Sequence, residues 1–288
     1  MKSSGERWEI TRAQHRRKVG RYRRALSRGL QKARKESGLT WEEIRASGLP
    51  SRTTIQRWEN GDGIPTLPEL KFAALDVYKV DERKFEDFKL WLREGDGPTT
   101  WEENGKGLPD IPGFRTLIDL EDVCDTYRMW APVVIPGPLQ IEPYMHAMFA
   151  VSPTLTLSDA KAMATIRMER QAKLVGDVAI TAVLAEEVLM RHIGGDDVMQ
   201  EQVQYLRRLT AERLADIRVL PLSGGAHCGT LGEFYLLDFP LDTEEPPTMY
   251  CDGWIVSHYT SDDKKLASFE SRFAELEAQS VPLEDFLT

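Results

Sequence analysis

Four polar side chains that lie close together in the sequence carry the groups that read the edges of DNA bases. They are Arg52, Thr53, Gln56 and Arg57. An arginine can donate two hydrogen bonds to guanine, a glutamine can pair with adenine in a similar way, and a threonine can serve either base. Residues three and four apart lie on one side of a helix. The spacing therefore predicts a helix that reads bases.

Two short helices joined by a tight turn are expected to position these residues, between Leu39 and Gly61. Thr40 is a suitable N-cap for the first helix, and Glu43 completes a capping box three residues later. A glycine and a proline then end this helix, because glycine tolerates positive φ and proline cannot continue it. Ser51 is the expected cap of the second helix, which the terminal glycine closes.

The apolar residues of both helices are expected to face a core. Trp41 and Ile44 form an apolar stripe on the first helix, and Ile55 and Trp58 lie three apart on the second. With those positions turned inward, the polar residues of the second helix are left to face outward. The N-terminus of that helix would also suit a phosphate group.

This arrangement resembles the helix-turn-helix of the Xre and phage-repressor-like regulators, over about residues 26–80. The resemblance implies that the second helix enters the major groove, where Arg52, Thr53 and Arg57 occupy base-reading positions. It also implies phosphate contacts from Trp41, Ser51 and Asn60. The alternative is an ordinary helical hairpin inside a larger core.

The distribution of charge favours DNA independently of this resemblance. Residues 1–95 hold 22 Lys and Arg against 14 Asp and Glu, a net charge of +8, whereas the remaining residues hold 15 against 32, a net charge of −17. The first 35 residues alone hold 13 basic and 2 acidic residues. Arg21 and Arg24 in this run are therefore expected to neutralise phosphates, which would make the affinity fall with salt. A solvated arm is the alternative, and the two are compatible because such arms often order only on nucleic acid.

A stretch rich in glycine and proline, residues 95–113, is the expected linker between two domains. Before it we expect a basic arm over residues 1–18 and a helical DNA-binding domain over residues 19–94. The helices expected in addition to the two described cover residues 12–36, 68–79 and 81–94. Aromatic residues at helical spacing fit a core better than a stacking platform; they are Tyr78, Phe85, Phe88 and Trp91.

The remaining residues, 114–288, are expected to form an α+β domain with a small antiparallel sheet. Expected helices cover residues 114–130, 140–150, 158–175 with Ser158 as cap, 198–214 and 262–279. Expected strands cover residues 179–184, 217–221, 234–239 and 249–256, because they are rich in β-branched and aromatic residues and bounded by Gly or Pro. The fold class predicted for the whole chain is an all-α helix-turn-helix domain followed by this α+β domain.

Four segments of this second domain resemble, in order, signatures of one uncharacterised domain that follows Xre-type modules in actinobacterial, WhiJ-like regulators. They are VIPGPLQ at residues 134–140, RMERQ at 167–171, EEVLMRHIGG at 186–195 and IRVLPLSGGAH at 217–227, the last followed by GEFYLLDF. The resemblance implies regulation and a small cognate partner protein, and some members are described as antitoxin-like. The domain would then receive a signal from a partner or a small ligand.

A polar face on an otherwise apolar helix is the place where such a signal would bind. Arg167, Arg170 and Gln171 share this face, and Glu187 or its neighbour Glu186 could pair with them. In that case the group would be a structural salt-bridge network, which is the interpretation we favour over a ligand site.

Other chemistry has little support in the sequence. Cys228 follows His227, but adjacent residues of an extended segment point to opposite sides and cooperate poorly. The five histidines lack the HxxxH and HExxH spacings, and no phosphate-binding glycine loop is present, so we expect no metal, no cofactor and no catalytic residues. Three cysteines without CxxC spacing favour reduced thiols, and no apolar run is long enough to span a membrane. We therefore expect a cytoplasmic, nucleoid-associated protein.

The sequence thus predicts a transcriptional regulator that binds double-stranded DNA as a homodimer. A symmetric dimer is expected because one half-site offers few contacts for high specificity. The alternative is an antitoxin-like interaction module whose acidic domain sequesters a partner while DNA binding serves autoregulation. An enzyme would need converging polar residues, which the sequence does not reveal.

Overall fold

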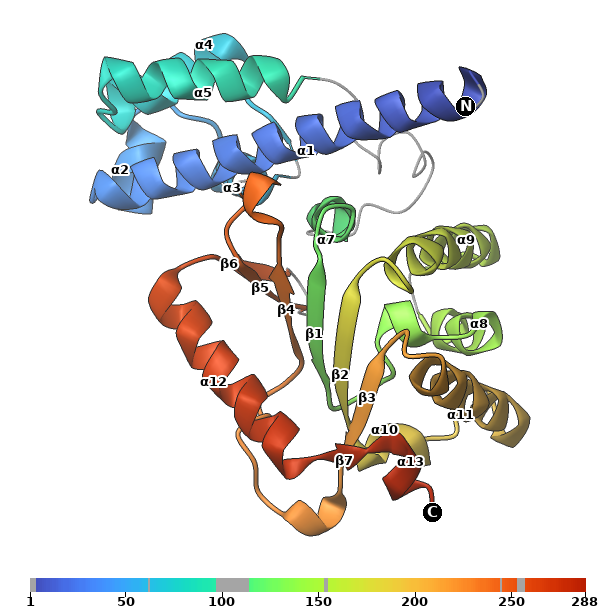
Figure 1. The fold of residues 1–288 in the computed structure, drawn as a ribbon. Coiled ribbons are helices and arrows are strands. Elements are labelled where there is room, and N and C mark those ends of the chain that lie inside the picture. The colour runs from blue at the N-terminus through green and yellow to red at the C-terminus, as the bar shows by residue number, and fades with distance from the viewer. Residues whose placement is uncertain (1–3, 62, 97–113, 153–154, 244, 253–256) are drawn as a thin grey trace. The chain divides into compact units, whose positions relative to one another are not determined.

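A computed structural model of the 288-residue chain describes residues 4–61, 63–96, 114–152, 155–243, 245–252 and 257–288 (Figure 1). These residues divide into two compact units. The first comprises residues 4–96 and 114–119, and the second begins at Leu120. The expected linker falls largely outside the described residues.

The first unit is entirely helical. Its elements are α1 (Ser4–Glu36), α2 (Trp41–Ala46), α3 (Arg52–Asn60), α4 (Leu67–Lys71), the π-helix η1 (Phe72–Val77), α5 (Glu82–Glu94) and most of α7 (Phe114–Glu121). The long basic helix begins at Ser4, earlier than the expected residue 12. The helix expected over residues 68–79 is instead α4 followed by η1.

Side-chain caps begin the helices of this unit as their sequence predicts. Thr40 and Glu43 form the expected capping box at α2, and the Ser51 hydroxyl accepts a hydrogen bond from the Thr54 amide at the start of α3. A second capping box, which we did not predict, joins Thr66 and Glu69 at α4. Because these side chains satisfy amides that the helix leaves open, each boundary is fixed locally.

One apolar core joins α1 to all the other helices that precede residue 96. The aromatic residues Tyr78, Phe85 and Phe88 are buried in it, as expected, and Trp91 packs partly buried at its edge. The remaining buried members are mostly aliphatic: Leu26, Leu30, Ala33, Ile44, Leu49, Ile55, Leu70, Ala73, Ala74 and Val77, with Trp58. Burial of this surface is the main force that holds the helices together.

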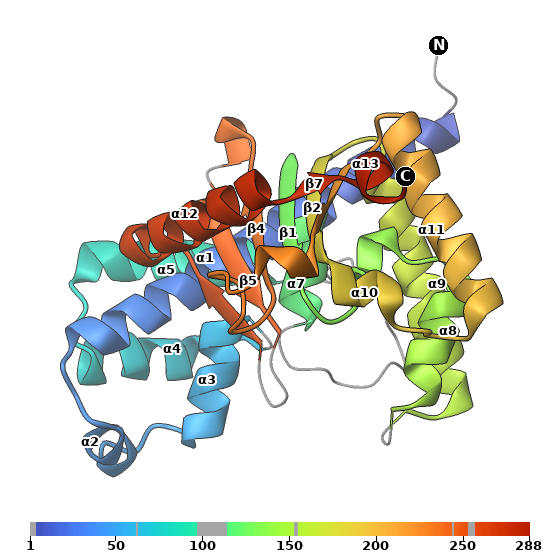
Figure 2. The same cartoon turned by 90° about the horizontal axis from the view of Figure 1, so that it is seen from below.

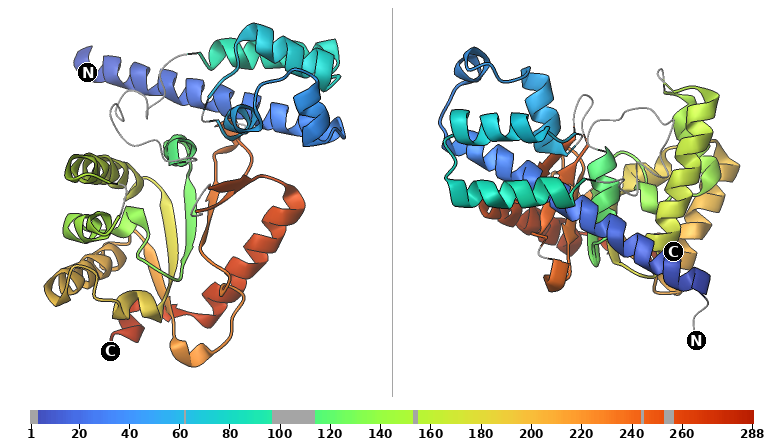
Figure 3. Two further views of the ribbon diagram at one scale, coloured as in Figure 1. Left: turned by 180° about the vertical axis from the view of Figure 1, so that it is seen from behind. Right: turned by 90° about the horizontal axis from the view of Figure 1, so that it is seen from above.

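The second unit has helices on both faces of a seven-stranded sheet (Figures 1, 2 and 3). The strands are β1 (Thr126–Ala131), β2 (Ala179–Ala185), β3 (Asp216–Leu220), β4 (Phe234–Asp238), β5 (Thr248–Cys251), β6 (His258–Thr260) and β7 (Val281–Pro282). Helices α8 (Glu142–Ala150), α9 (Leu157–Leu174) and α11 (Asp196–Ala211) cover one face, and α12 (Asp263–Gln279) covers the other. Two short helices complete the unit, α10 (Glu186–Met190) and α13 (Leu283–Phe286).

The sheet has the order β6-β5-β4-β1-β2-β3-β7. Strands β1, β2 and β3 run parallel, and the other neighbouring pairs are antiparallel. The predicted α+β class is thus confirmed, and most strand pairs are antiparallel as expected. The parallel centre arises because helices connect β1 to β2 and β2 to β3, which returns each strand in the same direction.

The helix expected over residues 114–130 is wrong in its second half. α7 ends at Glu121, and residues 126–131 form the central strand β1. The apolar residues of this stretch fit a helical period, but Tyr127, Met129 and Trp130 are buried between the two helical layers of the unit. Tertiary packing therefore decides the structure here against the local pattern.

The start of α9 and several short elements of this unit differ from the sequence-based expectation. Thr156 rather than Ser158 caps α9, in a capping box with Asp159. The short helices α10 and α13 and the strands β6 and β7 were not predicted. Residues 253–256 of the last expected strand lie outside the described residues.

A buried ion pair links the end of α7 to α9. Both oxygens of Glu121 accept hydrogen bonds from Arg170, at 2.6 Å and 2.7 Å, and the Tyr127 hydroxyl donates to the same carboxylate at 3.2 Å. Burial alone would lower the pKa of Arg170, but the adjacent carboxylate outweighs this effect and raises it. The pair is bidentate and carries a third hydrogen bond, the geometry in which attraction can offset desolvation.

Glu121→Ala is therefore expected to destabilise the second unit by about 3–5 kcal/mol, because it removes the bidentate carboxylate partner of the buried Arg170 charge. Urea unfolding monitored by circular dichroism would measure the loss. Glu284→Ala is the matched control, since the Arg207–Glu284 pair is bidentate but exposed and should matter little. Equal effects of the two substitutions would contradict this account.

Candidate DNA-binding face

Helix α3 has two sharply different sides. Ile55, Trp58 and Glu59 are buried, with exposed fractions of 2%, 6% and 9%. The four residues expected to read bases are all exposed on the remaining surface of the helix: Arg52, Thr53, Gln56 and Arg57. The orientation expected from the sequence is therefore found, and four hydrogen-bonding side chains are exposed on one side of α3.

Both ends of α3 are defined by their turn residues. Ser51 is exposed and its hydroxyl lies 3.0 Å from that of Thr54, while Gly61 ends the helix at φ +79°. At the preceding turn, Gly48 has φ +92°. These left-handed conformations favour glycine, so the sequence fixes where the two helices stop. The exposed N-terminus of α3 carries the partial positive charge that attracts phosphate.

Trp41 of α2 contacts both α1 and α3. Its ring lies 4.5 Å from the guanidinium carbon of Arg34 and 4.8 Å from that of Arg52. Stacking a guanidinium on an aromatic face restricts the arginine and is favourable. Trp41 therefore holds Arg52, the first residue of α3, in addition to the phosphate contact expected of it.

A part-buried ion pair fixes α3 against α1. Arg34 donates from Nε and Nη2 to the two oxygens of Glu59, at 2.6 Å and 2.9 Å. The hydrogen bond to Glu59 raises the pKa of Arg34. We did not predict this pair, because the two residues lie 25 positions apart and neither belongs to a recognisable spacing. Together with the burial of Ile55 and Trp58, this pair holds the inward side of α3 against the core.

The other expected backbone contacts differ in their exposure. Arg21 is half-buried beside Tyr22, with its guanidinium carbon 5.7 Å from the ring centre. Arg24 is only 5% exposed, so the expectation that it meets phosphate is not supported. It lies on the side of α1 that faces the interior of the unit, which a count of charges along the sequence does not reveal. Asn60 is half-buried, and its carbonyl accepts a hydrogen bond from Thr116 at 2.8 Å.

The polar face of α9 in the second unit is mainly structural. Gln171 donates to the carbonyls of Pro138 and Gln140, at 2.8 Å and 2.9 Å, and Arg170 is occupied by Glu121. Glu187 is exposed and does not join this group, while Glu186 accepts a hydrogen bond from the Leu222 amide. The expected salt-bridge network exists, but its carboxylate comes from α7 instead of α10.

Arg167 is the member of this group that has no carboxylate among the described residues. Its Nη1 donates to the Gln140 side chain at 2.6 Å, and its guanidinium carbon lies 4.9 Å from the centre of the Phe149 ring. Burial lowers the pKa of Arg167 to about 10, with a further contribution from Arg170. The side chain still carries a charge at neutral pH and is partly exposed.

His227 and Cys228 do not form a catalytic pair in the part of the chain that the structure describes. The Nδ1 atom of His227 accepts a hydrogen bond from the Gly229 amide, whereas the Cys228 thiol donates to the Arg272 carbonyl. Burial raises the pKa of Cys228, which disfavours the thiolate. The described residues contain no group of three or more side chains able to hold a metal ion. None of the described helices is both long and apolar enough to cross a membrane.

Comparison with known proteins identifies both units. Residues 114–286, well over half of the chain, match the family described as a domain of unknown function, DUF5753. The chain belongs to the DUF5753 family. Ahead of the DUF5753 region, residues 30–75 match a family described as helix-turn-helix, so the first unit carries an Xre-type module of a DNA-binding regulator. No curated protein and no solved structure matches the chain.

Arg34→Lys is expected to lower the free energy of unfolding of the helix-turn-helix unit by about 1–3 kcal/mol, because an ammonium replaces neither the two-pronged contact with Glu59 nor the stack on Trp41. Native-state hydrogen exchange of the α3 amides would localise the loss. Arg83→Lys, at an exposed position of α5, is the control and should leave the protection of α3 unchanged. Unchanged protection of α3 would show that the pair does not hold this helix.

The stability of the same unit is expected to depend on Tyr78 at alkaline pH. Burial, with a contribution from Glu59, raises the pKa of Tyr78 to about 12. Since an unfolded tyrosine titrates near pH 10, this stabilisation is complete below that pH and disappears as the pH rises to about 12. Tyr78→Phe should reduce the dependence, measured as the difference in urea midpoint between pH 9 and pH 11.5. An equal change in urea midpoint between the two pH values for both proteins would contradict this expectation.

Proposed function

We propose that this protein is a sequence-specific transcriptional regulator that binds double-stranded DNA as a homodimer through α3. The observation that carries the proposal is the exposure of four base-reading side chains on one side of α3. A helix of this size fits the major groove, and the helix-turn-helix match supports that placement. Arg52, Thr53, Gln56 and Arg57 read bases, and Trp41, Ser51, Asn60 and Arg21 contact the backbone.

The DUF5753 unit is proposed to control this binding by receiving a signal in the cytoplasm, as the resemblance to actinobacterial, WhiJ-like regulators implies. Arg167 is the favoured contact because it is a charged, partly exposed side chain that donates to the neutral Gln140 side chain, while its Nε has no hydrogen-bond partner in the described residues. An acidic group on a small ligand or a partner protein would complete its pairing. Gln171 holds the neighbouring loop, Arg170 pairs with Glu121, and Glu187 is not part of this contact.

Selection of binding sites from a random DNA library with the full chain, followed by affinity measurements, tests the proposal. Arg57→Ala should cost about 1–3 kcal/mol at the selected site and relax the preference at one base position. Arg21→Ala should weaken all sequences alike and reduce the salt slope by about one.

Arg83→Ala removes one exposed positive charge from α5 and is the matched control for both variants. It should leave the sequence preference unchanged. Absence of any salt-sensitive affinity for DNA in the unaltered protein would overturn the proposed function. An unchanged base preference in the Arg57 variant would show that α3 does not read the bases.

A further inference from the structure

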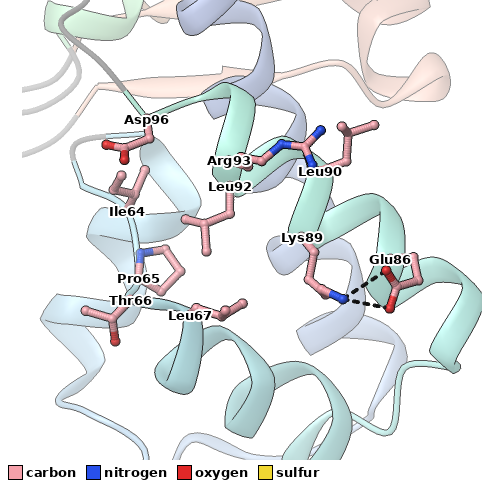
Figure 4. A pocket seen from close by; sticks show the side chains of 10 residues that line it. All are labelled: Ile64, Pro65, Thr66, Leu67, Glu86, Lys89, Leu90, Leu92, Arg93 and Asp96. Carbon is pink, nitrogen blue, oxygen red and sulfur yellow. Dashed lines mark hydrogen bonds and ion pairs between the residues drawn. The ribbon is translucent and has the colours of Figure 1, made fainter.

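A groove of about 690 Å³ in the first unit lies between α5 and the segment that leads from α3 into α4 (Figure 4). Its two basic side chains are paired with carboxylates of α5. Lys89 donates to both oxygens of Glu86, at 2.9 Å and 3.0 Å, and Arg93 donates to Glu94 at 3.2 Å. The positive charges of this groove are therefore neutralised within the chain. Arg167 of the second unit differs, because part of its guanidinium has no hydrogen-bond partner among the described residues.

Three elements surround the Arg167 guanidinium. α9 carries the side chain, the 3₁₀ turn η2 (Gly137–Leu139) packs against α9, and α8 supplies the Phe149 ring, whose centre lies 4.9 Å from the guanidinium carbon. Nη1 donates to the Gln140 side chain at 2.6 Å. Nε is buried, yet neither Nε nor Nη2 donates a hydrogen bond to any described residue. The edge formed by Nε and Nη2 is thus the unpaired part of this side chain.

The neighbouring Arg170 shows what the same edge binds when it is filled. Its Nε and Nη2 donate to the two oxygens of Glu121, at 2.6 Å and 2.7 Å. A carboxylate matches this edge because its two oxygens meet two parallel N–H groups. A buried donor without a partner costs free energy, which a carboxylate bound to Arg167 would recover. Burial lowers the pKa of Arg167 only to about 10, so the side chain is charged at neutral pH.

The single positive charge of Arg167 limits the charge of a matching ligand. Arg170 is neutralised by Glu121, whose negative charge also raises the pKa of Arg167. A phosphate monoester carries about −1.5 to −2 charges at neutral pH, so it would leave negative charge uncompensated beside Glu121. The residues after 95 hold 15 basic and 32 acidic residues, a net charge of −17, which disfavours a dianion further. A carboxylate, with one charge, is the better match.

We propose that the Nε–Nη2 edge of Arg167 is a binding site for a small monocarboxylic acid, which it holds through two hydrogen bonds. The proposal rests on the proposed function and deepens it, since it names the class of signal that the DUF5753 unit receives. Gly137 leaves room beside this edge: a Cβ at that position would lie 3.4 Å from Nε and 3.5 Å from the guanidinium carbon, which are ordinary contact distances. Because Nε is buried, only a narrow group reaches it, which favours a free acid over a carboxylate on a folded protein surface.

Acetate is the simplest probe of this class, and a nitrogen–proton correlation spectrum of the arginine Nε–H groups in the full chain reports its binding. One bidentate contact supports an affinity of about 1 mM. Acetate should shift the Arg167 signal saturably, whereas sodium chloride at the same ionic strength should not. The Arg170 signal is the internal control and should not move, because Glu121 already fills the same edge.

Two substitutions test the edge itself, with the side-chain amide of Gln140 as a second reporter. Gly137→Ala places a methyl group against Nε without removing a charge, and Arg167→Lys keeps the charge but removes the Nε donor. Each should weaken acetate binding at least about tenfold. Arg213→Gln, which removes an exposed positive charge from the same unit, should bind acetate as the unaltered protein does. Circular dichroism and thermal melting establish that the variants are folded.

Three results would overturn the proposal: no saturable shift of the Arg167 signal, an equal shift of the Arg170 signal, or a Gly137 variant that binds acetate as tightly as the unaltered protein. Inorganic phosphate that shifts the Arg167 signal at lower concentrations than acetate would overturn the choice of a carboxylate. DNA affinity measured in parallel tests the proposed function separately. No affinity for DNA would refute that function, while the spectra would still decide the site.

Discussion

The contact between Arg34 and Glu59 determines how the helix-turn-helix presents its polar side. A carboxylate on the inward side of a helix is costly unless a cation reaches it with good geometry. Arg34 does so from α1 with two short hydrogen bonds, and the same guanidinium stacks on Trp41 of α2. The Arg34 side chain therefore joins α1, α2 and α3. A rotation of α3 would break the pair and expose Ile55 and Trp58, so the ion pair and the apolar contacts together keep its polar residues outward.

In the second unit, buried glutamines provide hydrogen-bond partners for the buried backbone groups of a loop. The segment between β1 and α8 has few backbone hydrogen bonds of its own, although much of it is buried. Gln140 of the segment itself, Gln171 of α9 and Gln202 of α11 bind its carbonyls and amides, at distances between 2.6 Å and 2.9 Å. Leaving these buried backbone groups unpaired would cost more free energy than the hydrogen bonds contribute. The glutamine side chains are therefore required for the loop to adopt this conformation. The segments that resemble family signatures thus coincide with a scaffold.

How much of this structure the sequence predicts depends on how local each determinant is. The caps of α2 and α3 and the inward position of Ile55 and Trp58 follow from neighbours within a few residues, and they were predicted correctly. The strand β1 was missed because its environment is made by strands more than 45 residues away. The burial of Arg24 and the pairing of Arg170 with Glu121 were missed for the same reason, since a charge count contains no information about contacts across the fold.

The division of charge between the two units bears on selectivity if α3 reads DNA as proposed. A protein with a net charge of −9 is repelled by a duplex at long range, yet residues 1–95 carry +8. Because salt screens charges beyond about 8–10 Å, the basic region governs the attraction once it is close to the phosphates. The acidic remainder opposes every approach by a similar amount, whatever the base sequence. A penalty of the same size lowers the affinity for cognate and for non-specific DNA by the same factor, so it leaves their ratio unchanged. The acidic remainder therefore lowers the fraction of protein held on non-specific DNA, while discrimination between sequences rests on the base contacts.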